Sequence, residues 1–290
     1  MVLQLDTAFE PHYGQSTQVT PLIRRVVADN PGPFTFYGTG TYIVGRGELA
    51  VIDPGPLDRT HLAALLRATQ GERITHILIT HTHIDHSPLA RPLKEATGAT
   101  IYGYGPHGSV GGIEAGADLE FRPDRRVTDG EVFTGPGWTL EALHTPGHAE
   151  NHLCFALKEE QSLFCGDHVM GWSTTVVALP DGDMTLYMRS LERLAARPEA
   201  PFYPTHGNPI RDPRQHVAAL IQHRLERRAK VLAALSATPR KPLDLVPQVY
   251  GPSLDPRLRI AAAASLEAHL VELKDEGLAV EWPQGWRRST

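Results

Sequence analysis

Cysteine is scarce in this chain, because its 290 residues include only Cys154 and Cys165. The two do not form a CxxC pair or any other ligand-like spacing, so a disulfide framework and a thiolate metal cluster are both excluded. Cys165 lies in a short β-prone run, and we expect it to be buried filler.

Long apolar runs are also missing. No segment approaches the ~18 apolar residues of a membrane span, and residues 1–14 lack a basic stretch followed by an apolar one. We therefore expect a cytoplasmic protein with no membrane partner. A hydrophobic content of 41% is ample for a folded core, and 290 residues suit one large domain with a smaller appendage.

An overall excess of basic charge is absent, since the formal net charge is −5, unlike that of a typical nucleic-acid-binding protein. The charge is unevenly distributed. Residues 211–290 contain 13 Lys+Arg and 9 Asp+Glu, so they carry +4 while the first 210 residues carry −9. This shift predicts two domains, residues 1–210 and residues 211–290.

Histidine, by contrast, is plentiful, with 15 residues. The run Thr80–His86 reads THTHIDH and directly follows Ile74–Thr80, which is typical of a buried strand. Isolated histidines are usually solvated, but four metal-ligand side chains in six positions argue against that explanation. His81 and His83 can project to the same side of an extended backbone, and Asp85 and His86 follow. Such nitrogen and oxygen ligands suit zinc.

Three more candidate ligands, His148, Asp167 and His206, each follow a strand-like run. Thr139–Thr145 alternates apolar and polar residues, and Ser162–Cys165 is short and β-prone. If these strands align in one sheet, all the candidate ligands emerge on a common rim.

Other local patterns predict further elements. Phe34–Val44 and Asp118–Phe121 are expected to be strands, and Leu186–Ala196 is expected to be a helix. Ser87 can cap a helix that runs to Gly98, although Pro92 requires that helix to begin late or bend.

The combined pattern resembles the metallo-β-lactamase superfamily, in which HTHIDH at residues 81–86 is followed by His148, Asp167 and His206 at intervals of 62, 19 and 39 residues. Val51–Gly55 is similar to the early strand-end motif of that family, which contains Asp53. The resemblance covers roughly residues 20–210. It implies an α/β (α+β) fold, the four-layered αββα sandwich, which two successive sets of strands and helices also predict.

The resemblance implies two groups of metal ligands and one bridging residue: His81, His83 and His148; Asp85, His86 and His206; and Asp167. It implies two Zn²⁺ ions, with Mn²⁺ or iron as alternatives, and it identifies Asp85 and Asp167 as the candidate catalytic residues. Asp53 would support the site by accepting the second ring N–H of a ligand histidine, and its structural alternative is a turn residue.

This ligand set implies a hydrolase. Two cations about 3.5–4 Å apart lower the pKa of a bridging water from ~15.7 towards ~7, which supplies a hydroxide nucleophile at neutral pH. A single iron would instead suit an iron-dependent persulfide dioxygenase, which uses a similar motif.

The C-terminal part is predicted to contain helices at 213–235 and 256–276, followed by a hairpin at 278–289. This arrangement resembles a winged helix, and after a metallo-β-lactamase domain it is similar to the β-lactamase-like protein 2 group. That group includes metal-dependent endoribonucleases that act on single strands. Thr205 departs from its pattern, where glycine commonly precedes the last ligand histidine. Because the resembled group includes endoribonucleases, a single-stranded RNA phosphodiester is the first substrate hypothesis. A small thioester, lactone or other ester, as in glyoxalase II, is the alternative.

Candidate substrate contacts are Arg224 and Arg228 on a basic helix, together with Trp172 and Tyr104, whose rings could stack on a base or an acyl group. A solvated helix face and ordinary packing are the structural alternatives. The 256–276 helix carries four acidic residues in its second half, which argues against sequence-specific binding of duplex DNA. Core packing or a homodimer contact is expected for that helix instead.

Overall fold

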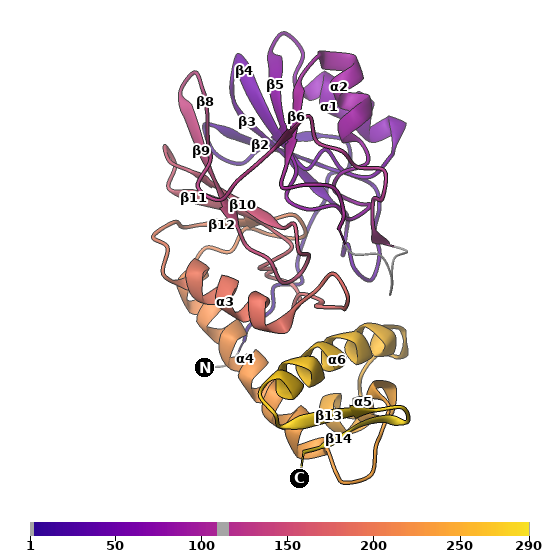
Figure 1. Cartoon of the computed structure of the whole chain (residues 1–290). Helices are drawn as coiled ribbons and strands as arrows, with labels where there is room; N and C mark the ends of the chain where they lie inside the picture. The colour runs from indigo at the N-terminus through magenta and orange to yellow at the C-terminus, as the bar shows by residue number, and fades with distance from the viewer. Residues whose placement is uncertain (1–2, 109–115, 290) are drawn as a thin grey trace.

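The computed structural model describes residues 3–108 and 116–289. Most of the chain forms two β-sheets that pack face to face, with helices on both outer sides (Figure 1). This arrangement confirms the predicted αββα fold class. Within the described ranges, no helix combines the length and the apolar character needed to cross a membrane.

The first sheet has seven strands in sequence order: β1 (Ser16–Gln18), β2 (Ile23–Val27), β3 (Gly40–Arg46), β4 (Glu48–Ile52), β5 (Arg73–Leu78), β6 (Thr100–Gly103) and β7 (Arg125–Arg126). Strands β4 to β7 are parallel. Helices α1 (Arg59–Ala68) and α2 (Ala90–Thr97) form the crossovers and cover the outer face. Leu65 and Leu93 of these helices pack with Ile77 and other residues of the strands.

The second sheet has five strands: β8 (Val132–Gly135), β9 (Trp138–His144), β10 (Leu153–Leu157), β11 (Ser162–Gly166) and β12 (Phe202–Pro204). Helices α3 (Met184–Ala195) and α4 (Pro213–Ala234) cover its outer face, where Tyr187 and Leu220 pack with Leu163. Phe155 and Phe164 lie in the core between the two sheets.

Strand direction brings the candidate ligands to one edge. Strands β9 and β11 are both antiparallel to β10, and β12 is parallel to β11, so the three share one direction. Backbone hydrogen bonds join the sheets at their carboxyl ends, where the Leu153 N–H donates to the Thr80 carbonyl and the Gly40 N–H donates to the Thr205 carbonyl. The loops after β5, β9, β11 and β12 therefore converge.

The C-terminal part contains α5 (Pro242–Tyr250), a 3₁₀ turn (Pro256–Leu258), α6 (Arg259–Asp275), and the hairpin of β13 (Ala279–Trp282) and β14 (Gly285–Arg288). Helix α4 extends from α3 to these elements (Figure 1). One side of α6 packs in the C-terminal core through Leu266 and Leu270, and Ala268 packs against the second sheet's helices. This double burial confirms the packing role expected for α6.

One predicted strand, Phe34–Val44, begins later than expected, and another, Asp118–Phe121, does not form. The first starts at Gly40, because residues 34–37 form a turn in which Phe36 has φ +57° and bridges Gly32. Asp118–Phe121 is not a strand. Its Asp118 N–H donates to the Thr82 carbonyl, which fixes the segment against the histidine-rich loop.

One helix prediction also needs correction, and one helix was missed. Ser87 does not cap α2, which begins late, at Ala90, as Pro92 requires. Pro92 lies in the first turn, where the backbone N–H has no intrahelical acceptor to lose. Helix α5 was not predicted, because Pro242 and Pro247 interrupt its helical pattern; Pro242 occupies the start of the helix, where proline is tolerated.

Candidate metal centre

Two glycines shape the loops that carry His148 and Asp167. Gly166 has φ +51°, and a Cβ there would lie 2.5 Å from Nε2 of His152. Gly147 has φ +135°, and a Cβ there would lie 2.3 Å from the backbone of Tyr187. Neither position accommodates another residue without a shift, so glycine allows the chain to turn sharply as it leaves β11 and β9.

The structure brings all seven predicted ligands into one cluster. Ligand atoms lie within 4.8 Å of one another in three sets: His81, His83 and His148; Asp85, His86 and His206; and His81, His86 and Asp167. We call the first set the first ligand group and the second set the second ligand group. Nε2 of His81 lies 2.9 Å from Nδ1 of His83, and Oδ2 of Asp85 lies 3.2 Å from Nε2 of His206.

Asp167 lies between the two groups. Its Oδ2 is 3.9 Å from Nε2 of His148 in the first ligand group. It is also 3.5 Å from Nε2 of His86 and 3.4 Å from Nε2 of His206 in the second ligand group. One carboxylate is therefore in reach of ions held by either group.

Unpartnered atoms test whether these residues suit metal ions. Nε2 of His86, His148 and His206 and Oδ1 of Asp167 are buried without a hydrogen bond of ordinary geometry, although an Asp85 oxygen lies 3.2 Å from Nε2 of His86 and of His206. An unsatisfied buried polar atom costs roughly 1–3 kcal/mol, so four in one cluster indicate a missing positive partner. Imidazole nitrogens with carboxylate oxygens suit zinc, and also manganese or iron.

The outer ring nitrogens of the histidines are held by acceptors. Nδ1 of His86 lies 2.9 Å from Oδ2 of Asp53, which also accepts the Thr80 hydroxyl at 2.6 Å. Nδ1 of His206 lies 3.1 Å from the Gly38 carbonyl, and Nδ1 of His148 lies 2.7 Å from the Val176 carbonyl. Carboxylate and carbonyl oxygens only accept, so each Nδ1 carries a hydrogen, and Nε2 is the ring nitrogen that faces the cluster.

The two ligand groups differ in charge before any ion binds. Burial, reinforced by neighbouring histidines, lowers the pKa of His81 well below its usual value and that of His83 to about 3. Burial also opposes charge on His206, but Asp167 and Asp85 outweigh it and raise the pKa of His206 to about 10. The same carboxylates raise the pKa of His86 well above its usual value. His81 and His83 of the first group are therefore neutral, whereas the second group contains ion pairs.

Several supporting residues were not predicted from the sequence. The Thr39 hydroxyl donates to Oδ2 of Asp85 at 3.2 Å, and Oδ2 of Asp181 lies 3.7 Å from Nε2 of His83. Thr205, the departure from the glycine pattern, places its hydroxyl 3.4 Å from Oδ2 of Asp53. Thr39 and Asp181 lie in loops without a motif, so no local signal identified them, and Thr205 was noted only as a departure from the family pattern.

The two predicted aromatic contacts lie in different places. Trp172 stacks on Phe36, with ring centroids 4.5 Å apart and an angle of 9° between the planes. A Cβ at Gly207 would lie 3.2 Å from Trp172, so the stack is immediately beside the residue that follows His206. Tyr104 stacks instead on His144, at 4.0 Å and 8°.

Arg224 and Arg228 of α4, which were predicted to contact the substrate from a basic helix face, are used in internal contacts. Arg224 is buried, and its guanidinium donates to the Thr175 carbonyl. Arg228 forms ion pairs with Glu272 and Glu276 of the C-terminal part. Both arginines therefore hold parts of the protein together, and neither presents a free cation to a nucleic-acid strand.

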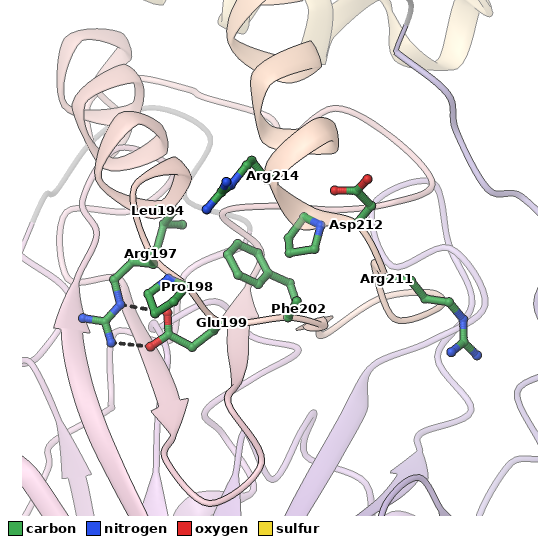
Figure 2. A pocket seen from close by; sticks show the side chains of 10 residues that line it. Leu194, Arg197, Pro198, Glu199, Phe202, Arg211, Asp212 and Arg214 are labelled. Carbon is green, nitrogen blue, oxygen red and sulfur yellow. Dashed lines mark hydrogen bonds and ion pairs between the residues drawn. The ribbon is translucent and has the colours of Figure 1, made fainter.

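A cavity of about 420 Å³ lies between the end of α3 and the start of α4. Figure 2 shows Arg197 paired with Glu199 on one side, Phe202 at the base and Arg214 opposite. Phe202 begins β12, whereas His206 follows the other end of that strand. The cavity is thus separate from the metal cluster.

Comparisons with known proteins agree with this fold. Residues 35–206 match the family model of the metallo-beta-lactamase superfamily, and residues 242–286 match the beta-lactamase associated winged helix domain. The fold is shared with a beta-lactamase domain protein from Burkholderia ambifaria, with a TM-score of 0.81, 22% identity, and coverage of 99% of this chain and 97% of that chain.

Among similar proteins, the atrochrysone carboxyl ACP thioesterase of Claviceps purpurea is 31% identical over 261 residues, which cover 87% of this chain and 79% of the relative. The lactamase-like protein adaB of Aspergillus niger is 36% identical over 228 residues, covering 78% and 67%. The fold and these relatives identify a metallo-beta-lactamase-fold hydrolase whose histidine and aspartate cluster could hold metal ions. The chain belongs to the metallo-beta-lactamase superfamily, with a winged-helix domain at its C-terminus.

Proposed function

We propose that this chain is a metal-dependent thioesterase that hydrolyses a thioester with a bulky apolar or aromatic acyl group. The cluster of seven ligands with four unpartnered buried atoms carries the metal-dependent part of the proposal. The relatives named as acyl carrier protein thioesterases support the thioester part. This choice reverses the order reached from the sequence, where RNA came first, since Arg224 and Arg228 are used in internal contacts.

The residues of the cluster have distinct tasks in this hydrolysis. Two cations, held by the two ligand groups with Asp167 between them, would supply carbonyl polarisation and a water that is acidic near neutral pH. Asp85 is the more exposed of the two candidate catalytic carboxylates, at 19% against 10% for Asp167. We assign Asp85 the task of accepting the proton of the attacking water and passing it to the leaving thiolate. A C–O bond forms, the C–S bond breaks, and a thiol and a carboxylic acid result; the acid then ionises to a carboxylate and releases its proton to solvent.

An aromatic group beside the cluster supports the choice of acyl group. We call Phe9, Phe36, Tyr37 and Trp172 the aromatic wall; Tyr37 lies 4.4 Å from Phe36 and 6.1 Å from Phe9 between ring centroids. Tyr37 is 41% exposed, so part of the wall faces solvent. The loop that carries it also contacts the second ligand group, through Thr39 and Gly38. An acyl group that packs on the wall would lie next to the reacting carbonyl.

The test offers four substrates, namely an aromatic acyl thioester, an aliphatic acyl thioester, single-stranded RNA and a persulfide, to protein loaded in turn with zinc, manganese or iron. Thiol release from aromatic and aliphatic acyl thioesters should depend on the metal and be lost in Asp167→Ala. Cleavage of end-labelled single-stranded RNA with no thiol release would restore the RNA hypothesis. Oxygen uptake with a persulfide by the iron-loaded protein would instead indicate a dioxygenase. We propose zinc as the metal, and the binding of two ions per chain stays a prediction. The cytoplasmic location also stays a prediction.

A further inference from the structure

An irregular segment links the C-terminal domain to the first ligand group. Residues 174–178 belong to no helix or strand, although Thr175 and Val177 are fully buried. A buried segment outside a sheet must find its hydrogen-bond partners elsewhere, so the partners of this one identify what holds it in place.

Two helices of the C-terminal half supply those partners. The Arg224 guanidinium of α4 donates to the Thr175 carbonyl, and the Ser265 hydroxyl of α6 accepts the Val177 N–H at 3.3 Å. Both side chains are buried, Arg224 at 3% exposure and Ser265 at 6%. Arg224 also lies over the ring of Tyr187, 5.1 Å from its centroid, which limits the positions that the guanidinium can adopt.

The same segment holds the metal cluster from its other side. Between the two braced residues, the Val176 carbonyl accepts Nδ1–H of His148 at 2.7 Å. The Thr175 hydroxyl donates to the Asp167 carbonyl at 2.7 Å. A few residues later, Asp181 lies beside Nε2 of His83. The segment therefore sets the direction of His148 and supports the backbone of Asp167.

We propose that Arg224 and Ser265 are positioning residues for the first ligand group, so that α4 and α6 together act as a brace of the metal centre. Orientation of a ligand histidine by its outer nitrogen typically changes metal affinity about 10–100-fold. If the brace is removed, the Val176 carbonyl loses its fixed place and His148 loses its preferred direction. The second ligand group has its outer contacts at Asp53 and Gly38, so it should keep its ion.

The experiment compares Arg224→Met and Ser265→Ala, singly and together, with Arg227→Met as the matched control. Arg227 lies on the same helix, but its guanidinium donates to the Val249 carbonyl and lies over Tyr250, within the C-terminal domain. Zinc affinities are measured by competition with a chelator. Nitrogen NMR of labelled histidines follows the Nδ1–H form of His148 and shows which group loses its ion.

We expect the double variant to bind one of the two ions about 10–100-fold more weakly, with a changed His148 signal and an unchanged His206 signal. Ser265→Thr, which retains the hydroxyl, should restore the affinity. Equal weakening of both ions, or equal effects from Arg227→Met, would overturn the proposal, as would wild-type affinities in the double variant. If Arg224→Met does not fold, Ser265→Ala and Ser265→Thr decide the question. The proposal rests on the metal centre of the proposed function, but its metal titration needs no substrate, so a failed thioesterase assay leaves it intact.

Discussion

The two ligand groups share a cluster but differ in how they are charged and held. The first group contains three histidines, which are supported by the Val176 carbonyl, by the carboxylate of Asp181 and, at His81, by the Thr80 hydroxyl. The second group includes Asp85 and is supported by Asp53 and Gly38, which follow β4 and precede β3. The chain after β11 therefore supports His83 and His148 of the first group, whereas Asp53 and Gly38 support His86 and His206 of the second.

This difference indicates that the two ions can be tuned separately. A histidine held neutral by burial is ready to bind an ion, whereas a protonated histidine beside a carboxylate must first lose its proton. Asp167 is within reach of both groups, so it is the residue whose loss cannot be confined to one of them. Substitution of Asp167, which is within reach of both groups, and of residues that support one group therefore tests whether the two ions can be tuned separately.

The largest effect is expected for Asp167→Ala, which removes the shared carboxylate. We expect thioester hydrolysis to fall on the order of 10³-fold and at least one ion to be lost, because neither group retains the bridge. Metal content by elemental analysis and the rate of thiol release check this. Asp129→Ala is the control, because Asp129 pairs with Arg193, 2.8 Å away, outside the cluster. If Asp167→Ala keeps full activity and two bound ions, Asp167 is not shared by the two ligand groups.

Asp53→Asn and Asp181→Asn should act on different ions. Asp53→Asn removes the charged acceptor of His86 and should weaken the ion of the second ligand group about 10–100-fold. Asp181→Asn should weaken the ion of the first ligand group less, because Asp181 lies 3.7 Å from His83 while Asp53 lies 2.9 Å from His86. Chelator competition measures both affinities, and each variant is the control for the other. If both variants weaken the same ion, the groups are not separate.

The ligands themselves could be predicted from sequence because each one stands in a short motif at the end of a strand. Their supports could not. Gly38 and Val176 contribute backbone carbonyls, which any residue type provides, and Gly38 meets His206 across 168 positions of sequence. The turn of the chain at Phe36 gives no periodic signal, so the loop with the aromatic residues was expected to be a strand.

The charge pattern of the sequence was also insufficient to identify a nucleic-acid-binding surface. Arg224, Arg227 and Arg228 form a basic run in the sequence, which favoured a solvated or nucleic-acid-binding face. Their acceptors, such as Thr175 and Glu276, lie in segments that only the tertiary fold brings close. The fold class was predictable because it depends on alternation of elements, whereas the role of each arginine depends on the packing of α4.

The charge difference between the groups predicts how metal affinity changes with pH. His206, with a pKa of about 10, is protonated at neutral pH in the metal-free protein, so an ion of the second group must displace that proton. Its affinity should rise with pH by up to about tenfold per unit for each proton released, until that pKa is passed. His83, with a pKa of about 3, is already neutral, so an ion of the first group displaces no proton from that residue and its affinity should rise less steeply with pH. Calorimetry in buffers of different ionisation enthalpy counts the protons, and equal release for both ions would contradict this difference.

The smallest effect is expected at the aromatic wall, which touches the second ligand group only through its loop. Phe36→Leu removes the stack on Trp172 while keeping an apolar side chain, so the metal ions should stay bound. An aromatic pair contributes about 0.5–1.5 kcal/mol beyond its buried area, which corresponds to a change of roughly two- to tenfold. We therefore expect kcat/KM for aromatic acyl thioesters to fall by that factor while acetyl thioesters change little.

Tyr104→Leu is the matched control for this last variant, because Tyr104 is similarly exposed, at 39%, but stacks on His144 instead. Its substrate preference should equal that of the wild type. If Phe36→Leu slows acetyl and aromatic thioesters alike, the loop acts through Thr39 on Asp85 and not through contact with the acyl group. A change in KM with constant kcat would place the wall in ground-state binding, whereas a fall in kcat would place it in alignment of the carbonyl with the second ligand group.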